Sequence, residues 1–167
     1  MKFLKSSVFV ALAMAMSSGA IAASDVATVT AKVSVVSENM VNAVWNSNGT
    51  LTAGPLAQNK KLGTLSITST GTHDGFIIGG EGSAVSGGVV NIPFKNAQGQ
   101  VAFRGKLIGG NQGAIDKGTV SVGSYSGPGW QLPTTDASRD LNFGSAFKAN
   151  LEAGDYTATF YVKQYNN

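Results

Sequence analysis

The chain has 167 residues, no cysteine, 22 glycines, 13% charged residues and a formal net charge of +3. This balance argues against a nucleic-acid-binding surface, and the absence of cysteine excludes disulfide bonds as a source of stability. The length suits one domain with its own core.

The first 22 residues are typical of a secretory signal peptide. Lys2 and Lys5 give a basic start, Val8–Met16 is an unbroken apolar run, and small residues precede Ala23. The apolar run is shorter than the about 20 residues that span a bilayer, which disfavours a membrane anchor. We expect cleavage after Ala22 and export to the cell envelope. The remaining chain then has ten basic and nine acidic residues.

A strand with one apolar face follows this leader. Residues Val26–Val36 read V-A-T-V-T-A-K-V-S-V-V, and apolar and polar side chains alternate as they do along a half-buried β-strand. Such a strand must pair with a sheet, either in its own domain or in a neighbouring molecule. Its apolar face consists of Ala27, Val29, Ala31, Val33 and Val35.

Most of the remaining chain consists of short apolar or alternating runs between clusters of Gly, Asn, Ser and Pro. This pattern predicts an all-β antiparallel sandwich with Greek-key connections. Ala97–Gly99 is typical of a hairpin connection, and Ser124–Asn142 is expected to be the longest irregular segment. The other expected strands are Asn42–Trp45, Lys61–Ser69, Gly75–Ile78, Gly88–Pro93, Gln100–Ile108, Gly118–Val122 and Asp155–Gln164.

The last expected strand alternates like the first and is expected to leave one edge of its sheet uncovered. It follows a turn at Ala153–Asp155, and the sequence offers no further strand after it. Natural proteins usually protect such an edge, because it can pair with other strands. The apolar residues of this strand are Tyr156, Ala158, Phe160 and Val162.

Together, the two end strands predict a mechanism of assembly. If the N-terminal strand of one subunit completes the sheet of the next, the spare strand and the uncovered edge are both satisfied. This contact does not close on itself, so it produces a linear polymer. The alternative is that Val26–Val36 is simply the first strand of a closed sandwich.

These features resemble those of bacterial chaperone–usher fimbrial subunits, the pilins. The resemblance rests on the leader, the alternating segment Ala27–Val33, the glycine-rich β body and the terminal A-G-D-Y-T-A-T-F-Y-V strand. The lack of cysteine is similar to that of atypical and colonisation-factor pilins. One departure lies at the end of the sequence, where Tyr165 is followed by two asparagines instead of being penultimate.

The resemblance implies an incomplete immunoglobulin-like β-sandwich, completed by a donor strand from a neighbouring subunit. It also implies a periplasmic chaperone, an outer-membrane usher and other copies of the chain as partners, no cofactor, and a final location in a surface fimbria. The implied divisions are a signal peptide (1–22), a donor-strand extension (23–36) and a pilin domain (37–167). The implied donor residues are Ala27, Val29, Ala31, Val33 and Val35, and the last-strand residues near the acceptor groove and chaperone are Tyr156, Ala158, Phe160 and Val162.

Candidate catalytic and metal-binding residues are sparse. His73 is the only histidine, and although Asp74 follows it, the G-x-S-x-G pattern that would supply a nucleophile is absent. Asp136 and Asp140 flank a turn without the spacing of a calcium loop. One histidine and no cysteine offer little to a transition metal. The sequence therefore predicts no catalytic residue, no metal site and no enzymatic activity.

The segment that carries Tyr125 and Trp130 is the candidate receptor contact. Small residues surround both aromatic rings, and such rings stack on sugars or on protein surfaces. The alternative is that Trp130 fills one end of the core; Trp45 is expected to be a core residue. The favoured function is a fimbrial structural subunit that also adheres to a host glycan or protein. The alternative function is a monomeric, secreted carbohydrate-binding domain.

Overall fold

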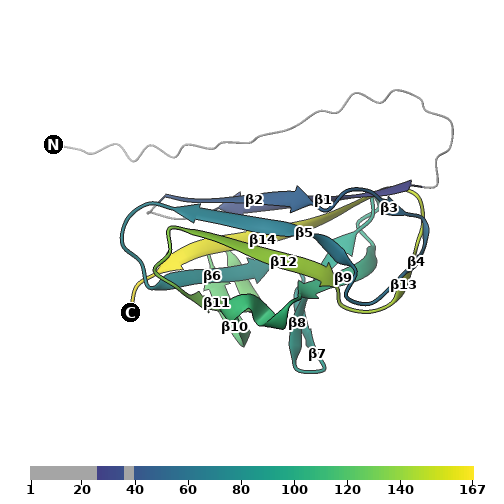
Figure 1. The fold of residues 1–167 in the computed structure, drawn as a ribbon. Helices are drawn as coiled ribbons and strands as arrows, with labels where there is room; N and C mark the ends of the chain where they lie inside the picture. Colours follow the sequence, from purple (N-terminus) through teal and green to yellow (C-terminus); the bar gives the residue numbers. More distant parts are fainter. Residues whose placement is uncertain (1–25, 36–39) are drawn as a thin grey trace.

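Short strands separated by glycine-rich turns make up nearly all of the computed structural model, which describes residues 26–35 and 40–167 (Figure 1). No helix in these two ranges is long and apolar enough to cross a bilayer. The elements are β1 (Val26–Val35), β2 (Val41–Ser47), β3 (Leu51–Thr52), β4 (Gly54–Leu56), β5 (Lys61–Ser69), β6 (Gly75–Gly80), β7 (Ala84–Ser86), β8 (Val89–Lys95), β9 (Val101–Leu107), the 3₁₀ turn η1 (Gly110–Gly113), β10 (Ile115–Val122), β11 (Tyr125–Pro133), β12 (Ser138–Ser145), β13 (Ala149–Leu151) and β14 (Asp155–Tyr165).

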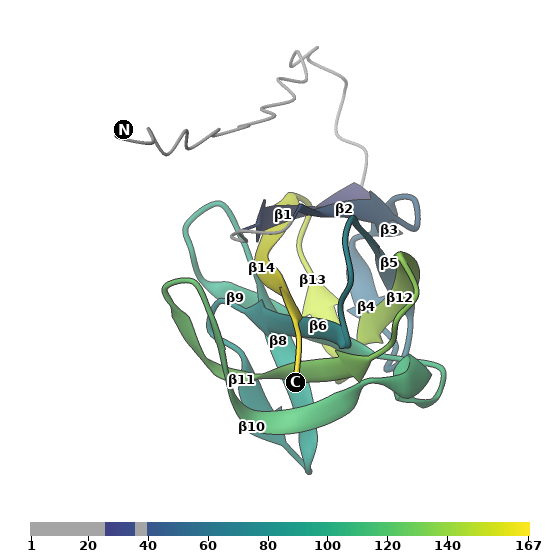
Figure 2. The same ribbon diagram turned by 90° about the vertical axis from the view of Figure 1, so that its left-hand side faces the viewer.

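The main strands follow one hydrogen-bonded order, β10-β11-β6-β14-β8-β9-β12-β5-β2, in which every neighbouring pair is antiparallel. This order curls over on itself. As a result β14 and β2, which are far apart in the order, lie on the same side of the molecule with β1 between them (Figure 2). Beside this order, β7 pairs with β8, and β13 pairs with β4.

The prediction of an all-β antiparallel fold is confirmed, and the hairpin at Ala97–Gly99 joins β8 to β9 as expected. The expectation of an irregular segment over Ser124–Asn142 is wrong, because β11 and part of β12 occupy it. Pro128 and the glycines around it concealed β11. Pro128 lies opposite the bulge at Lys117–Val120 in β10, where the ladder is interrupted and a missing N–H removes no ladder bond.

Aromatic rings hold the two layers of strands together. Trp45 of β2 stacks on Phe160 of β14 with ring centroids 5.4 Å apart, and Phe143 of β12 meets Trp130 of β11 edge-on at 5.5 Å. Such pairs stabilise a core beyond the area they bury. Trp45 is half-buried and packs against the buried cluster, which confirms its expected place in the core.

On the outer face of the β11-β6-β14 sheet, the ring of Tyr125 lies over Gly79. The ring stacks on Tyr161 with centroids 5.2 Å apart, and its hydroxyl donates a hydrogen bond to the Pro128 carbonyl oxygen at 2.7 Å. A Cβ atom at Gly79 would collide with the Tyr125 ring. The position of this ring therefore depends on glycine at residue 79.

Gly79→Ala is expected to lower the free energy of unfolding by about 1–3 kcal/mol, because the new methyl group must displace the Tyr125 ring from its stacked position. Gly118→Ala in β10 is the matched control, since a Cβ there meets no atom within 4 Å. We expect that substitution to change stability by less than about 0.5 kcal/mol. Urea denaturation followed by circular dichroism measures both, and equal losses would contradict the role given to Gly79.

Candidate functional site: the groove between β14 and β2

The two edges of β14 have different partners. One edge pairs with β6 from Phe160 to Tyr165 and meets β8 at Thr157. The opposite edge, over residues 155–162, pairs with β1, and no other strand of the described ranges covers it. Without β1, its backbone N–H and C=O groups would form an open sheet edge.

β1 lies parallel to β14, and their register continues without a shift from Thr28 to Val35. The apolar positions that alternation marked in each strand coincide. They pair as Val29 with Tyr156, Ala31 with Ala158, Val33 with Phe160 and Val35 with Val162, while Ala27 pairs with Leu51 of β3. The structure thus brings the two expected sets of site residues together, and their roles in assembly stay a prediction.

The apolar residues of β14 line the inner side of this groove. Phe160 and Val162 have no exposed surface, and Tyr156 and Ala158 are only 3% and 4% exposed. Phe103 meets the Tyr156 ring edge-on at 5.4 Å, and the Tyr156 hydroxyl donates a hydrogen bond to the Glu152 carbonyl oxygen at 2.6 Å. These contacts hold the Tyr156 side chain in place on the apolar face of β14.

β2 forms the other side of the groove. It pairs with β5 along its whole length, and its other edge runs beside β1 without a hydrogen-bonded ladder among the described strands. The stack of Trp45 on Phe160 joins the β2 and β14 sides. The site is therefore a groove one strand wide, filled by β1, with a hydrogen-bonding edge on β14 and the Trp45–Phe160 stack joining its two sides.

The two residues expected to contact a receptor lie in different environments. Trp130 is fully buried, so a receptor contact at Trp130 is wrong, and the alternative of a core residue is what the structure shows. The register explains its burial, because Trp130 pairs with Ile78, whose side chain also faces the core. Tyr125 lies half-buried on the outer face, where a receptor contact stays a prediction.

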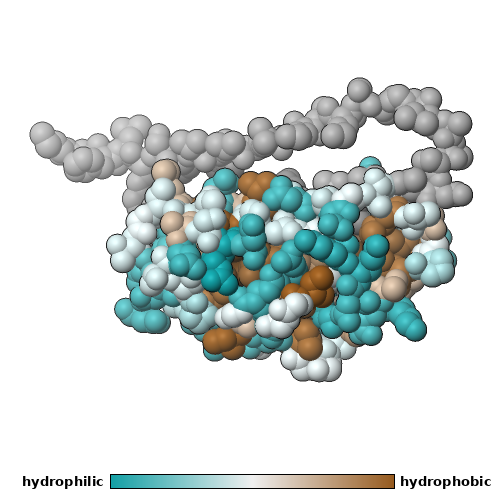
Figure 3. All heavy atoms as spheres, viewed as in Figure 1, coloured by the Kyte–Doolittle hydropathy of each residue, from teal (hydrophilic) through white to brown (hydrophobic). Residues whose placement is uncertain are grey.

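Exposed apolar side chains do not mark a second site. The face shown in Figure 3 is largely hydrophilic, and its apolar side chains form separate spots. Scattered apolar residues are ordinary on protein surfaces. The large ones that are most exposed in the described ranges come from different elements: Met40, Val44, Val85, Val101, Ile115 and Phe147.

The sequence also matches that of known proteins. The sequence model of the family described as SEF14-like adhesin matches residues 4–167. The chain belongs to the SEF14-like adhesin family. It is 38% identical over 141 residues to a fimbrial protein of Salmonella enteritidis, and the match covers 84% of this chain and 83% of that protein.

Two solved structures share the fold of this SEF14-like chain. The Salmonella SafD adhesin matches with a TM-score of 0.62 and 16% identity, over 77% of this chain and 90% of that one. HdaB, the minor tip subunit of the E. coli Hda pilus, matches with a TM-score of 0.57 and 16% identity, over 76% and 84%. The fold is thus the immunoglobulin-like sandwich of fimbrial subunits.

The histidine of this SEF14-like chain has a structural setting. His73 is buried, and its ring nitrogens lie 3.4 Å and 3.2 Å from the carbonyl oxygens of Gly71 and Asp136. The Asp74 carboxylate instead accepts the backbone N–H of Asn167 at 2.7 Å, so it does not orient the His73 ring. Within residues 26–35 and 40–167, no group of three His, Asp or Glu residues is suited to a metal ion.

Asp136 and Asp140, near the start of β12, have different partners. The Asp136 carboxylate lies 3.1 Å from Arg139 Nη1, and hydrogen bonding to Arg139 and then to Thr134 lowers the pKa of Asp136. Asp140 pairs with Ser66 in the β12–β5 ladder. The arrangement is that of a surface ion pair beside a strand.

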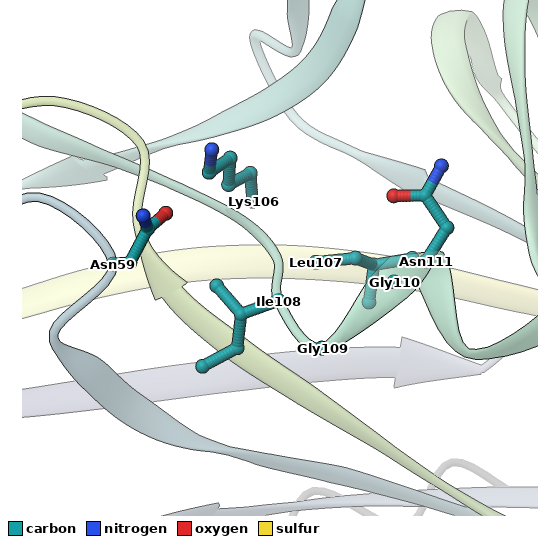
Figure 4. A pocket seen from close by; sticks show the side chains of 7 residues that line it. All are labelled: Asn59, Lys106, Leu107, Ile108, Gly109, Gly110 and Asn111. Atoms are coloured by element: carbon teal, nitrogen blue, oxygen red, sulfur yellow. The ribbon is translucent and has the colours of Figure 1, made fainter.

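A polar hollow of about 470 Å³ lies beside η1, between Asn59, Lys106 and Asn111 (Figure 4). Its wall is a left-handed turn, because residues 109–113 all have positive φ, a conformation that is unfavourable for Asn111 and Gln112. The Gln112 side-chain amide bonds both backbone groups of Asn142, at 2.9 Å each. These two hydrogen bonds hold the strained turn in place, so its conformation does not require a bound ligand as an explanation.

Phe160→Ala is expected to lower the free energy of unfolding by about 3–5 kcal/mol, because it removes the ring that joins the two sides of the groove. Tyr161→Ala is the matched control on the opposite face of β14. It removes the stacking contact with Tyr125, and we expect a loss of about 1 kcal/mol. Guanidinium denaturation measures both, and a larger loss at residue 161 than at 160 would contradict this assignment of faces.

Proposed function

We propose that this chain is a structural subunit of a bacterial surface fimbria and that it polymerises by donor-strand exchange. In this mechanism, the β1 segment of one subunit fills the groove between β14 and β2 of the next. The observation that carries the proposal is that β1 lies outside the main strand order and yet covers the edge of β14 over residues 155–162. Apart from residues 51 and 52 of β3, its pairing partner among the described strands is one edge of β14.

The direction of β1 supports the same conclusion. β1 runs parallel to β14, whereas every other strand pair in the described ranges is antiparallel. Parallel pairing is slightly less stable per residue than antiparallel pairing. Removing β1 also breaks no ladder of the main strand order. Another strand could therefore take the place of β1 while the main strand order stays intact.

Donor strand and groove are different surfaces of one subunit, so the contact between subunits is heterologous and propagates into a filament. Membership of an adhesin family and the likeness to a Salmonella fimbrial protein support this role. The proposed donor residues are Ala27, Val29, Ala31, Val33 and Val35, and the proposed groove residues are Tyr156, Ala158, Phe160 and Val162.

The proposal includes a route to the surface. Residues 1–22 serve as a signal peptide, 23–36 as the donor extension and 37–167 as the pilin domain; residues 1–25 and 36–39 lie outside the described ranges. A periplasmic chaperone would occupy the groove during transit, and an outer-membrane usher would pass subunits to the surface. An exposed host glycan or protein is the proposed receptor, with Tyr125 on the outer face as a contact. No catalytic step is part of this function.

Deleting residues 23–35 is expected to leave a subunit that aggregates alone and regains solubility with a peptide of residues 26–35, because the open edge of β14 then has a partner again. The Val33→Asp peptide is expected not to rescue it, since valine 33 pairs with the buried Phe160. The Lys32→Asp peptide, altered at an adjacent polar position, is the matched control and is expected to bind. Thermal unfolding with and without peptide measures the effect.

Two outcomes would contradict the proposal. If the truncated chain is a stable, soluble monomer without peptide, the groove does not require a strand. If it unfolds and no peptide rescues it, β1 is a fixed strand of a closed sandwich, as a monomeric binding domain would have.

A further inference from the structure

We infer that a subunit held by no chaperone closes its own groove: β1 of a chain occupies the gap between β14 and β2 of that same chain until a neighbour's β1 replaces it. The inference rests on the proposed polymerisation and adds the state of the subunit before assembly. Its direct basis is the uninterrupted parallel ladder within one chain, from Thr28 opposite Asp155 to Val35 opposite Val162.

The link to β2 sets the direction of β1 in this closed state. Five antiparallel steps separate β2 from β14 in the strand order, so these two strands run in opposite directions. Residues 36–40 alone connect β1 to β2. The six steps from Val35 to Val41 span at most about 22 Å, whereas β1 is roughly 30 Å long. β1 is therefore held antiparallel to β2, which makes it parallel to β14.

A neighbour's strand is free of this restriction. The apolar row of β1 reads almost identically in both directions, because valines lie two residues before and after Ala31. If the strand is reversed about Ala31, this residue stays opposite Ala158, and a valine still lies opposite each of Tyr156 and Phe160. The reversed strand can form an antiparallel ladder, which is slightly more stable. Replacing the chain's own parallel strand by a neighbour's antiparallel strand in the same groove is therefore favourable.

The short tether decides which strand wins at low concentration. A strand held by residues 36–40 is present at an effective concentration in the millimolar range, far above that of dilute free subunits. The closed state also covers the edge of β14 and so prevents indiscriminate pairing of monomers. A neighbour's strand prevails once subunits are concentrated at a site of assembly.

Cysteine pairs test the closed state directly, because the chain contains no cysteine of its own. Thr28→Cys/Asp155→Cys places two thiols at paired positions of the parallel ladder. Ser34→Cys/Asp155→Cys is the matched control, with the first thiol six positions further along β1, roughly 20 Å away. That distance is beyond the reach of a disulfide bond.

Dilute purified monomer is oxidised, and the products are separated by non-reducing electrophoresis. We expect at least about tenfold more intrachain disulfide in the first variant than in the control, given the geometric limits of the bond. The locked monomer is expected to form no multimer ladder on unboiled gels when concentrated, and to form one after reduction.

Two results would overturn the inference, and they differ from each other. An intrachain disulfide in the control variant, or bridges only between chains in the first variant, would contradict parallel self-closure and leave polymerisation by strand exchange standing. A first variant that locks as expected but forms no multimers after reduction would show that β1 never leaves its own groove. The proposed function would then fail together with the exchange step.

Discussion

The backbone edge of β14 over residues 155–162 is the constraint on which the rest of the structure depends. A row of N–H and C=O groups at a sheet edge must find a partner or remain open to any passing strand. In this chain the partner is β1, and the gap it fills is bounded by β2 and floored by the stack of Trp45 on Phe160. The closed sheet of the fold and the proposed assembly both depend on which strand pairs with this edge.

Much of this site is readable from the sequence, because each end strand has one apolar and one polar face. Alternation located both strands and the residues that the register later paired, such as Ala31 with Ala158. It could not give their relative direction, since a pattern of period two is unchanged when the strand is reversed. It also could not show whether the partner edge belongs to the same chain or to another.

The sequence failed where the environment of a residue is set by a distant strand. A proline usually argues against a strand. Pro128 is tolerated in β11 because it lies opposite a bulge in β10, and the residues around Pro128 do not reveal that bulge. The same holds for Trp130, whose glycine-rich surroundings suit an exposed loop as well as a core strand. Its pairing with Ile78 places it inside. Tyr125 stacks on Tyr161, on the face of β14 opposite the buried Phe160, so the proposed receptor contact and the proposed groove residues lie on different faces of this strand.

The place of β14 in the strand order also bears on when the chain can fold. β14 follows every other described strand in the sequence, yet it lies inside the order, between β6 and β8. Among the described strands, β10, β11 and β6 are joined by ladders to the remainder only through β14. Two partial sheets are therefore joined by the last of the described strands, and the contacts that unite them span long sequence separations, which slows folding. The two partial sheets can therefore unite only after nearly all of the described sequence has left the ribosome.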